Sequence, residues 1–450
     1  MTVQAAVRGL RYRKLSDNGL TAQVYREDEK KGIVFVSYVT VPIVDYSDDY
    51  KRTISELQNA KPGNYFLQIL LPDGRILTEK FKITASKAAR LDIQLDLEGP
   101  HEWTDLYALK GQFKHETRLT KGFTKSLVRH PKLYMELADK PKKGYALGIL
   151  APDDNGAAGM FKDHQILSNL SELVQDNLDV TSAVRRFGLL SKVTQPTFEG
   201  DDYALFRFTH SHVLREDEQN LEPFEFGPGT GLSRHYLIQE SVSGGALICL
   251  PTPWTSHNGQ EPVELLVNKN APGEATAISM TIGDPMINTM LGYINMGAIH
   301  EAAKLFDFKK AKEMLFEKIA YPLAATVGGY LLVFGMNLEA YKTLSNEWKY
   351  WIENLDHWFE WLPDGSVLHA ALHFMLGGSD HDTAYDALKR AYTRGLPFFT
   401  FGLKLMLDGF RYFAREGMEQ ANECLDVLKI IARYTDPSQP FLTVQFSRRL

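Results

Sequence analysis

The spacing of apolar residues changes from strand-like to helical near residue 284, and this change is the first guide to the architecture. Up to about residue 98 the apolar positions alternate or run in short β-branched segments, as in Leu20–Arg26 and Ile33–Val41. Arg90–Leu97 carries its apolar residues at every second position, which is typical of a half-buried strand. Several short strands with turns between them predict a small β-sandwich over residues 1–98.

A hairpin is the strongest local prediction in this first region. Tyr65–Leu71 and Arg75–Thr84 are two apolar-patterned runs joined by Pro72-Asp73-Gly74, and Pro62-Gly63-Asn64 precedes the first run. Proline presets one backbone angle of a turn, and glycine and aspartate tolerate the remaining ones. The two runs are therefore expected to pair as antiparallel strands.

Residues 144–284 are predicted to form a second, β-rich α+β domain. Gly144–Leu150, Tyr203–Leu214, His235–Glu240 and Ala246–Leu250 have strand patterns, and Val263–Val267 with Ala275–Ile282 is expected to form a hairpin. One segment, Phe161–Leu178, has its apolar residues at helical spacing instead.

The last region, residues 285–450, is predicted to be an α-helical repeat domain. Leu362-Pro363 is expected to open one helix, and Leu396-Pro397 is expected to open a matching one. The distance in sequence between the two Leu-Pro pairs equals the length of one tetratricopeptide repeat. Such helix pairs stack to make a common core and leave a long face for a partner. Pro437–Leu450 is expected to add a strand or to pack on this TPR-like solenoid. The predicted fold class is therefore multidomain α+β.

The stretch between Lys318 and Glu339 has no charged residue and is long enough to span a bilayer. Proline and several glycines interrupt it, and amphipathic segments flank it. A buried pair of short helices explains this stretch better than a membrane span does.

Composition fits a packed soluble protein and does not favour a nucleic-acid binder. The chain has 450 residues, 44% hydrophobic residues and a net charge of −6. Cys249 and Cys424 are its only cysteines, so a disulfide framework is not expected and the cytoplasm is the simplest location. The N-terminus has no apolar run typical of a signal peptide.

Residues 99–143 are rich in lysine and arginine and are predicted to form a basic connector. The connector is interpreted as an anion or nucleic-acid patch, or as an exposed, protease-sensitive link. A solvated charged face is the more common explanation for such a composition.

Two histidine pairs are candidates for metal binding. His369 and His373 have the i, i+4 spacing of zinc ligands, and a third ligand would come from Asp380, His381 or Asp382. The segment between them lacks the glutamate of a zinc-protease helix, so core histidines are favoured. His210 and His212 lie on one face of a strand before several acids, and a polar outer face is the favoured interpretation.

The remaining motifs do not predict catalysis. Gly227-Pro228-Gly229-Thr230-Gly231 lacks the lysine and the following helix of a phosphate-binding loop and is interpreted as a turn. Cys249 and Cys424 lie in apolar or helical surroundings without a nearby histidine, so both are expected to be inert. The prediction contains no catalytic residue, no cofactor and no metal.

Aromatic residues are dense in the helical region. Aromatic side chains dominate both cores and interface hot spots, and most of these are expected to pack between repeats. The candidates for binding a partner are Trp351, Trp358, Trp361, Phe398 and Phe399.

Several of these motifs resemble a known group of proteins. Pro62-Gly63-Asn64-Tyr65 with Leu71-Pro72-Asp73-Gly74, then Pro100-His101-Glu102-Trp103, Trp358–Gly365 and Arg394–Thr400 with Leu407-Asp408-Gly409, resemble an uncharacterised bacterial family. Members of that family are typically encoded beside caspase-like (CHAT-type) proteases of defence systems. The resemblance implies an association with such a protease and carries over no catalytic residue.

The sequence thus predicts a non-enzymatic interaction protein, with no membrane anchor, that acts as substrate, regulator or adaptor of a caspase-like protease in bacterial antiviral defence. Bacterial proteases of this class often prefer a basic residue before the cut, which makes the connector the expected cleavage region. The glycine- and acid-rich loop from Glu216 to Gly231 is the competing exposed site. The candidate protease-sensitive residues are Lys121, Lys125, Arg129 and Lys143. Two alternatives stay open, namely a hydrolase or metal-dependent enzyme with its site in the middle domain and a structural adaptor with no protease link.

Overall fold

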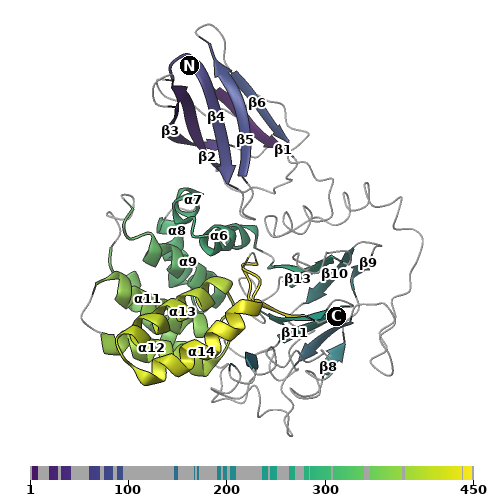
Figure 1. Cartoon of the computed structure of the whole chain (residues 1–450), viewed down its shortest axis with the longest axis vertical. Helices are drawn as coiled ribbons and strands as arrows, with labels where there is room; N and C mark the ends of the chain where they lie inside the picture. The colour runs from purple at the N-terminus through teal and green to yellow at the C-terminus, as the bar shows by residue number, and fades with distance from the viewer. Residues whose placement is uncertain are drawn as a thin grey trace.

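The computed structural model describes the strands before residue 284 and most of the chain after it (Figure 1). The described residues are 3–8, 20–28, 32–41, 60–70, 76–84, 89–94, 146–150, 167, 170–171, 190–193, 196–199, 203–208, 236–241, 244–250, 263–268, 278–282, 284–305, 308–338, 345–377, 381–437 and 439–447. The described residues form a strand-rich first part followed by a helical region, which confirms the predicted α+β fold class.

The N-terminal part contains a four-stranded antiparallel sheet in the order β3-β2-β4-β5. Its strands are β2 (Leu20–Asp28), β3 (Gly32–Val41), β4 (Gly63–Leu70) and β5 (Ile76–Ile83). Alternate residues of β2 and β4, such as Val24 and Leu67, are buried, as a period of two requires. The predicted hairpin is confirmed, because β4 and β5 pair along their whole length.

A second, two-stranded sheet joins the two ends of this part. β1 (Val3–Arg8) runs parallel to β6 (Ala89–Gln94), and Val3 pairs with Ala89. Arg90–Leu97 was expected to be a strand, whereas Val3–Arg8 was not named as one.

The middle part consists of two antiparallel sheets in the described residues. One has the order β14-β13-β10-β9, with β9 (Phe198–Glu199), β10 (Tyr203–Phe208), β13 (Val263–Asn268) and β14 (Ile278–Thr281). The other has the order β15-β12-β11-β7-β8, with β7 (Ala146–Leu150), β8 (Leu190–Val193), β11 (Tyr236–Ser241), β12 (Gly244–Cys249) and β15 (Thr443–Ser447). The predicted hairpin of β13 and β14 is confirmed. Of the predicted helix Phe161–Leu178, the described residues 167, 170 and 171 are helical.

The helical region begins at Asp284, which caps the first helix. Its carboxylate accepts hydrogen bonds from Met286 N at 2.9 Å and Ile287 N at 3.2 Å. The helices are α6 (Pro285–Asn295), α7 (Ile299–Leu305), α8 (Phe308–Phe316), α9 (Pro322–Phe334), α10 (Trp348–Trp358), α11 (Pro363–Met375), α12 (His381–Arg394), α13 (Thr400–Arg415) and α14 (Glu419–Tyr434).

Proline marks the helix starts only in part. Pro363 is the first residue of α11, as expected, but α13 begins at Thr400, a few residues after Pro397. The start positions 308, 348, 381 and 419 of every second helix are also not evenly spaced, as a strict repeat would require. The charge-free stretch contains α9, whose side chains are buried. Among the described residues, no helix is both long enough and apolar enough to cross a membrane.

The C-terminal segment fastens the helical region to the middle sheet. Leu442 N donates to Phe398 O at 2.9 Å, and Cys249 N donates to Leu442 O at 3.2 Å. β15 then pairs with β12 (Figure 1). Both expectations for Pro437–Leu450, an added strand and packing on the helices, are therefore met. A strand from the predicted helical domain, β15, thus completes a sheet whose other strands belong to the predicted middle domain.

Polar contacts also hold the same segment against α6 and α13. Lys404 Nζ donates to Asn295 O at 2.7 Å, and Asn295 Nδ2 donates to Pro437 O at 2.9 Å. Thr400 N donates to Pro440 O at 2.9 Å. The polar contacts of the tail are thus made through its backbone carbonyl groups.

The N-terminal sheet contacts the helical region at α7. Gln23 Nε2 lies 3.2 Å from Glu301 Oε1, and the Tyr38 ring lies 4.4 Å from the His300 ring between centroids. Burial, together with the nearby Glu301 carboxylate, raises the pKa of Tyr38. The phenol therefore stays protonated at this contact.

We expect a chain that ends at Pro440 to lose the cooperative unfolding of its helical region. The truncation removes the buried side chains of Phe441, Leu442 and Val444, each worth about 1.5–3 kcal/mol, against a total stability of about 5–15 kcal/mol. Urea denaturation followed by circular dichroism measures the loss. A chain that ends at Ser447 is the matched control, and equal stability of both chains would contradict the role of the tail.

Candidate functional site

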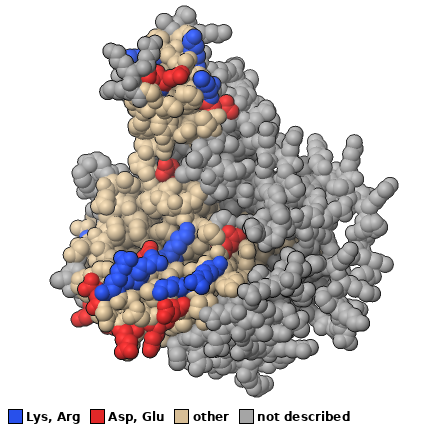
Figure 2. Space-filling view, viewed as in Figure 1, with Lys and Arg blue, Asp and Glu red and all other residues tan. Residues whose placement is uncertain are grey.

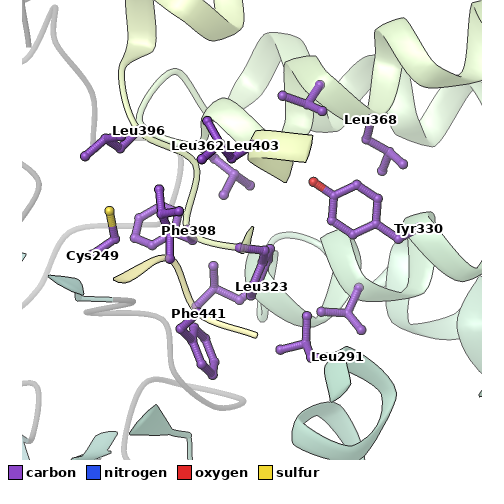
Figure 3. Close-up of a cluster of buried hydrophobic side chains, with 14 of the residues drawn as sticks. Cys249, Leu291, Leu323, Tyr330, Leu362, Leu368, Leu396, Phe398, Leu403 and Phe441 are labelled. Carbon is purple, nitrogen blue, oxygen red and sulfur yellow. The ribbon is translucent and has the colours of Figure 1, made fainter. Parts of the chain in front are cut away.

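A buried carboxylate on α11 joins three helical segments. Asp364 Oδ1 accepts a hydrogen bond from Tyr330 Oη at 3.0 Å, and its Oδ2 accepts one from Phe398 N at 2.6 Å. A Cβ at Gly402 would collide with this carboxylate, so only glycine fits there. Burial raises the pKa of Tyr330 well above its ordinary value, and Asp364 adds to the effect. Figure 3 shows Tyr330 and Phe398 in the surrounding apolar core.

A second buried carboxylate, Asp356 at the end of α10, ties that helix to α11 and α12. Its Oδ1 accepts from Ser366 Oγ at 2.5 Å and from Arg394 Nη1 at 2.8 Å. Its Oδ2 lies 2.8 Å from His369 Nδ1 and accepts from Arg390 Nη2 at 2.6 Å. Burial alone would raise the pKa of Asp356, but the bonds from His369 and the two arginines lower it well below its usual range. The carboxylate is therefore ionised and fully paired.

The pair His369 and His373 is part of this network, and among the described residues it does not gather with His381 or Asp382 as zinc ligands would. Asp380 lies outside the described residues. His369 Nδ1 is taken by Asp356, and its Nε2 lies 3.3 Å from His373 Nε2. His381 stacks on Tyr412 instead, with ring centroids 5.6 Å apart. Within the described part of the chain, no three His, Cys, Asp or Glu residues gather as metal ligands would.

Three of the five aromatic candidates are corrected, because they lie in the core. Trp361, Phe398 and Phe399 are buried, and Trp361 meets Phe398 edge-on at 5.6 Å between ring centroids. Phe398 and Phe399 lie in the link between α12 and α13, where the C-terminal segment covers them. Their burial stabilises the fold and leaves them unavailable to a partner.

The other two candidates, Trp351 and Trp358, belong to an exposed group that we call the aromatic–lysine surface: Phe316, Lys318, Ile319, Trp351 and Trp358. Phe316 is 63% exposed and Trp358 is 43% exposed, which is unusual for such large apolar side chains. The Phe316 ring lies 5.0 Å from the Trp351 ring between centroids. The group extends from the end of α8 to α10.

Lys318 is the unusual charge of this surface. Its Nζ lies 5.7 Å from the centre of the Trp351 ring and 5.3 Å from that of Trp358, and the residue is only 5% exposed. Burial lowers its pKa, and no described carboxylate offsets that effect. Lys312 also lies over Trp351, at 5.4 Å, but it forms an ion pair with Glu347 at 3.2 Å. Lys318 is thus a cation held by two indole faces alone among the described residues.

The sequence analysis missed Phe316, Lys318 and Ile319. It treated Lys318 only as the edge of a charge-free stretch. The available signal was the seven-residue spacing of Trp351 and Trp358, which places both on one face of α10 and predicts an aromatic stripe there. The residues that complete the surface come from the end of α8 and from the turn after it, and no local pattern relates them to α10.

Charged side chains gather elsewhere on the helical region. Figure 2 shows Lys and Arg over one face of it, with Asp and Glu along one edge. On α13 and α14, Arg411 pairs with Asp408 at 2.6 Å, and Lys429 pairs with Asp426 at 2.9 Å. Exposed i, i+3 pairs of this kind contribute little energy and keep a face solvated.

Both cysteines have surroundings that make them poor nucleophiles. Cys249 is buried on β12, and Figure 3 shows it beside Phe398. Burial and the neighbouring Glu423 raise the pKa of Cys424 to about 11. Its thiol therefore stays protonated at neutral pH.

Several predicted features lie outside the described residues. They are the connector with Lys121, Lys125, Arg129 and Lys143, the pair His210 and His212, and the glycine-rich segment 227–231.

Comparison with known proteins adds one finding. Residues 289–447 match the family model of the Y4kD C-terminal domain. No curated protein and no solved structure matches the chain. The matched segment extends from within α6 to the last residue of β15, which agrees with the observation that the tail strand belongs with the helices.

We expect Asp356→Asn to destabilise the protein by about 3 kcal/mol at pH 7, because it removes the buried counter-ion of two partly buried arginines. The folded-state pKa of Asp356 lies below the unfolded value of about 3.9. The ionised Asp356 therefore contributes its full share to the free energy of unfolding above the unfolded pKa. That contribution falls as the pH drops below the unfolded pKa toward the folded one.

Urea denaturation at pH 7 and at pH 3 measures both effects. The destabilisation caused by Asp356→Asn should shrink at the lower pH. Asp426→Asn, which alters an exposed pair, is the control and should change stability by less than about 1 kcal/mol. A destabilisation by Asp356→Asn that is equal at both pH values would contradict this assignment.

Proposed function

We propose that the protein is a non-catalytic interaction protein whose helical region docks a partner at the aromatic–lysine surface. The observation that carries this proposal is the exposure of Phe316 and Trp358 around the buried ammonium of Lys318. Large apolar side chains grouped on a surface mark binding sites in soluble proteins. Tryptophan is also the residue most enriched among interface hot spots.

The chemistry of the surface selects a class of partner segment. A docked apolar side chain would cover Phe316 and Ile319 and exclude water from the indole rings. In that dry setting the ammonium of Lys318 gains most from a carboxylate, because the local dielectric falls. The partner segment is therefore one that places an aspartate or glutamate next to a bulky apolar side chain.

The helical scaffold suits such a role. Asp356 anchors the end of α10, two residues before Trp358, to α11 and α12, so the indole is held by a rigid network. Preorganised side chains lose less entropy on binding. We propose that the region works as a TPR-like solenoid and that the two N-terminal sheets form a β-sandwich attached to it at α7.

We further propose that the partner belongs to a caspase-like protease system of bacterial antiviral defence in the cytoplasm. In that system the chain would be substrate, regulator or adaptor. The support for this proposal is the resemblance of its hairpin and helical motifs to a family encoded beside such proteases. A structural adaptor without a protease is the alternative, and the two differ in whether the purified protease binds this chain.

We expect Trp358→Ala and Phe316→Ser to weaken binding of an acidic, apolar peptide at least about tenfold, because each removes about 1.4 kcal/mol or more of buried contact. The peptide is selected from a random library on the full chain and its affinity is measured by fluorescence anisotropy. Lys318→Met should abolish the preference for an acidic residue and keep the apolar one.

Tyr350→Ser is the matched control, because Tyr350 is an exposed aromatic residue on another face of α10. All variants must unfold at the same temperature as the parent chain. Selected peptides that lack acidic residues, or that bind all variants equally, would refute docking at this surface.

If the neighbouring protease cleaves this chain, we expect the cut in the connector of residues 99–143, after a basic residue such as Lys121, Lys125, Arg129 or Lys143. A packed helix must unfold locally before it enters a protease groove. This local unfolding costs several kcal/mol, and its upper limit is roughly the free energy of global unfolding. Mass spectrometry of the fragments locates the cut. A cut within Asp284–Thr435, or no cut under activating conditions, would show that the chain is not a substrate of this kind.

A further inference from the structure

An apolar hollow of about 190 Å³ lies where α9, α11, α12 and α13 meet, on helices other than those of the aromatic–lysine surface. Its wall is almost wholly apolar. The residues that matter for its chemistry are Val367, Phe374, Met375, Leu388, Leu405 and Asp408. Nothing in the function proposed above uses this hollow.

The volume of the hollow limits what it can bind. An engineered apolar cavity of about 150 Å³ stays dry and binds benzene, whereas pockets for ordinary small-molecule ligands measure about 300–1,000 Å³. The hollow therefore fits one aromatic ring or one branched aliphatic group. It is too small for a nucleotide or a sugar, and it lacks the polar groups that such ligands need.

The walls are held in place by their own contacts. The Tyr412 ring stacks on His381 at 5.6 Å and meets Phe374 edge-on at 5.4 Å between ring centroids. A Cβ at Gly409 would lie 2.6 Å from Leu388 Cδ1, so α12 and α13 are in contact at the floor. A hollow with fixed walls is ready to bind without further ordering.

The hollow is open to the surface, and Asp408 is the charged residue among those that line it. The Asp408 side chain is 67% exposed and pairs with Arg411 through an i, i+3 contact of 2.6 Å. Exposed pairs of this kind contribute about 1 kcal/mol or less, so another cation can take the place of Arg411. Tyr412, at the rim, is 37% exposed. A free small molecule would leave part of its surface in water here, whereas a side chain of a larger partner continues outward along its own backbone.

We infer that this hollow is a second docking site, which receives one bulky apolar side chain of a partner protein while Asp408 binds an adjacent lysine or arginine of the same partner. The site prefers a basic neighbour, whereas the aromatic–lysine surface prefers an acidic one. The two sites would thus bind different segments of a partner, one with a basic residue and the other with an acidic residue beside the apolar side chain.

A random-peptide library selected on the full-length protein tests the inference. Peptides captured by the hollow should carry leucine, phenylalanine or tryptophan next to arginine or lysine. Ala371→Phe, which fills the hollow, should weaken the selected peptide at least about tenfold, equivalent to about 1.4 kcal/mol. Leu405→Phe also fills the hollow, from a position that is only partly buried. The affinity of this variant tests the inference if Ala371→Phe does not fold.

Two further variants separate this site from the other one. Asp408→Asn should remove the advantage of the basic residue over glutamine at the same peptide position. Trp358→Ala should leave the affinity of these peptides unchanged, so that failure of one site is distinguishable from failure of the other.

Three outcomes would overturn the inference. The first is equal peptide affinity of the parent and of a folded, hollow-filling variant. The second is selection of peptides without a basic residue. The third is stoichiometric binding of free indole or toluene with no peptide selected, which would make the hollow a site for a small apolar molecule.

Discussion

The buried carboxylate of Asp364 is the contact on which the rest of the helical region depends. It accepts the Tyr330 hydroxyl from α9 and the Phe398 backbone amide from the link before α13, and both partners lie 34 residues from it in the sequence. A carboxyl group at zero exposure has lost its hydration and needs hydrogen bonds from the protein, which the Tyr330 hydroxyl and the Phe398 amide supply. Its position therefore sets the distance between three successive segments of the core, and Gly402 is required to leave room for it.

Both ends of the molecule follow from this anchor. Phe398, once fixed, accepts the Leu442 amide through its carbonyl and so begins the path of the tail to β12. On the opposite side of α11, Asp356 fixes the end of α10 and with it Trp358. The buried polar contacts thus determine where an aromatic group stays exposed, and the proposed docking surface is a consequence of the core.

The sequence predicted most of the local elements but not how distant ones meet. Alternation found β2 to β6, and the Asp284-Pro285 start of the helices was correct. The sequence did not predict that β1 pairs in parallel with β6 or that β15 pairs with β12. The spacing of apolar residues indicates which face of an element is buried, but it does not indicate which other element covers that face. The same limit explains the aromatic candidates. Trp358 and Phe398 are both aromatic residues near a proline in the sequence, but distant segments, the tail among them, pack on Phe398 and leave Trp358 exposed.

The central claim is that tail, helices and buried carboxylates form one cooperative unit that carries the docking surface. Native-state amide hydrogen exchange tests it most directly, because it gives the opening free energy of single amides. The account predicts that the amides of Phe398, Thr400 and Leu442 exchange with the same free energy as the core of α11, which is that of global unfolding. Exchange of Leu442 and β15 at a much lower free energy, while α11 stays protected, would contradict it.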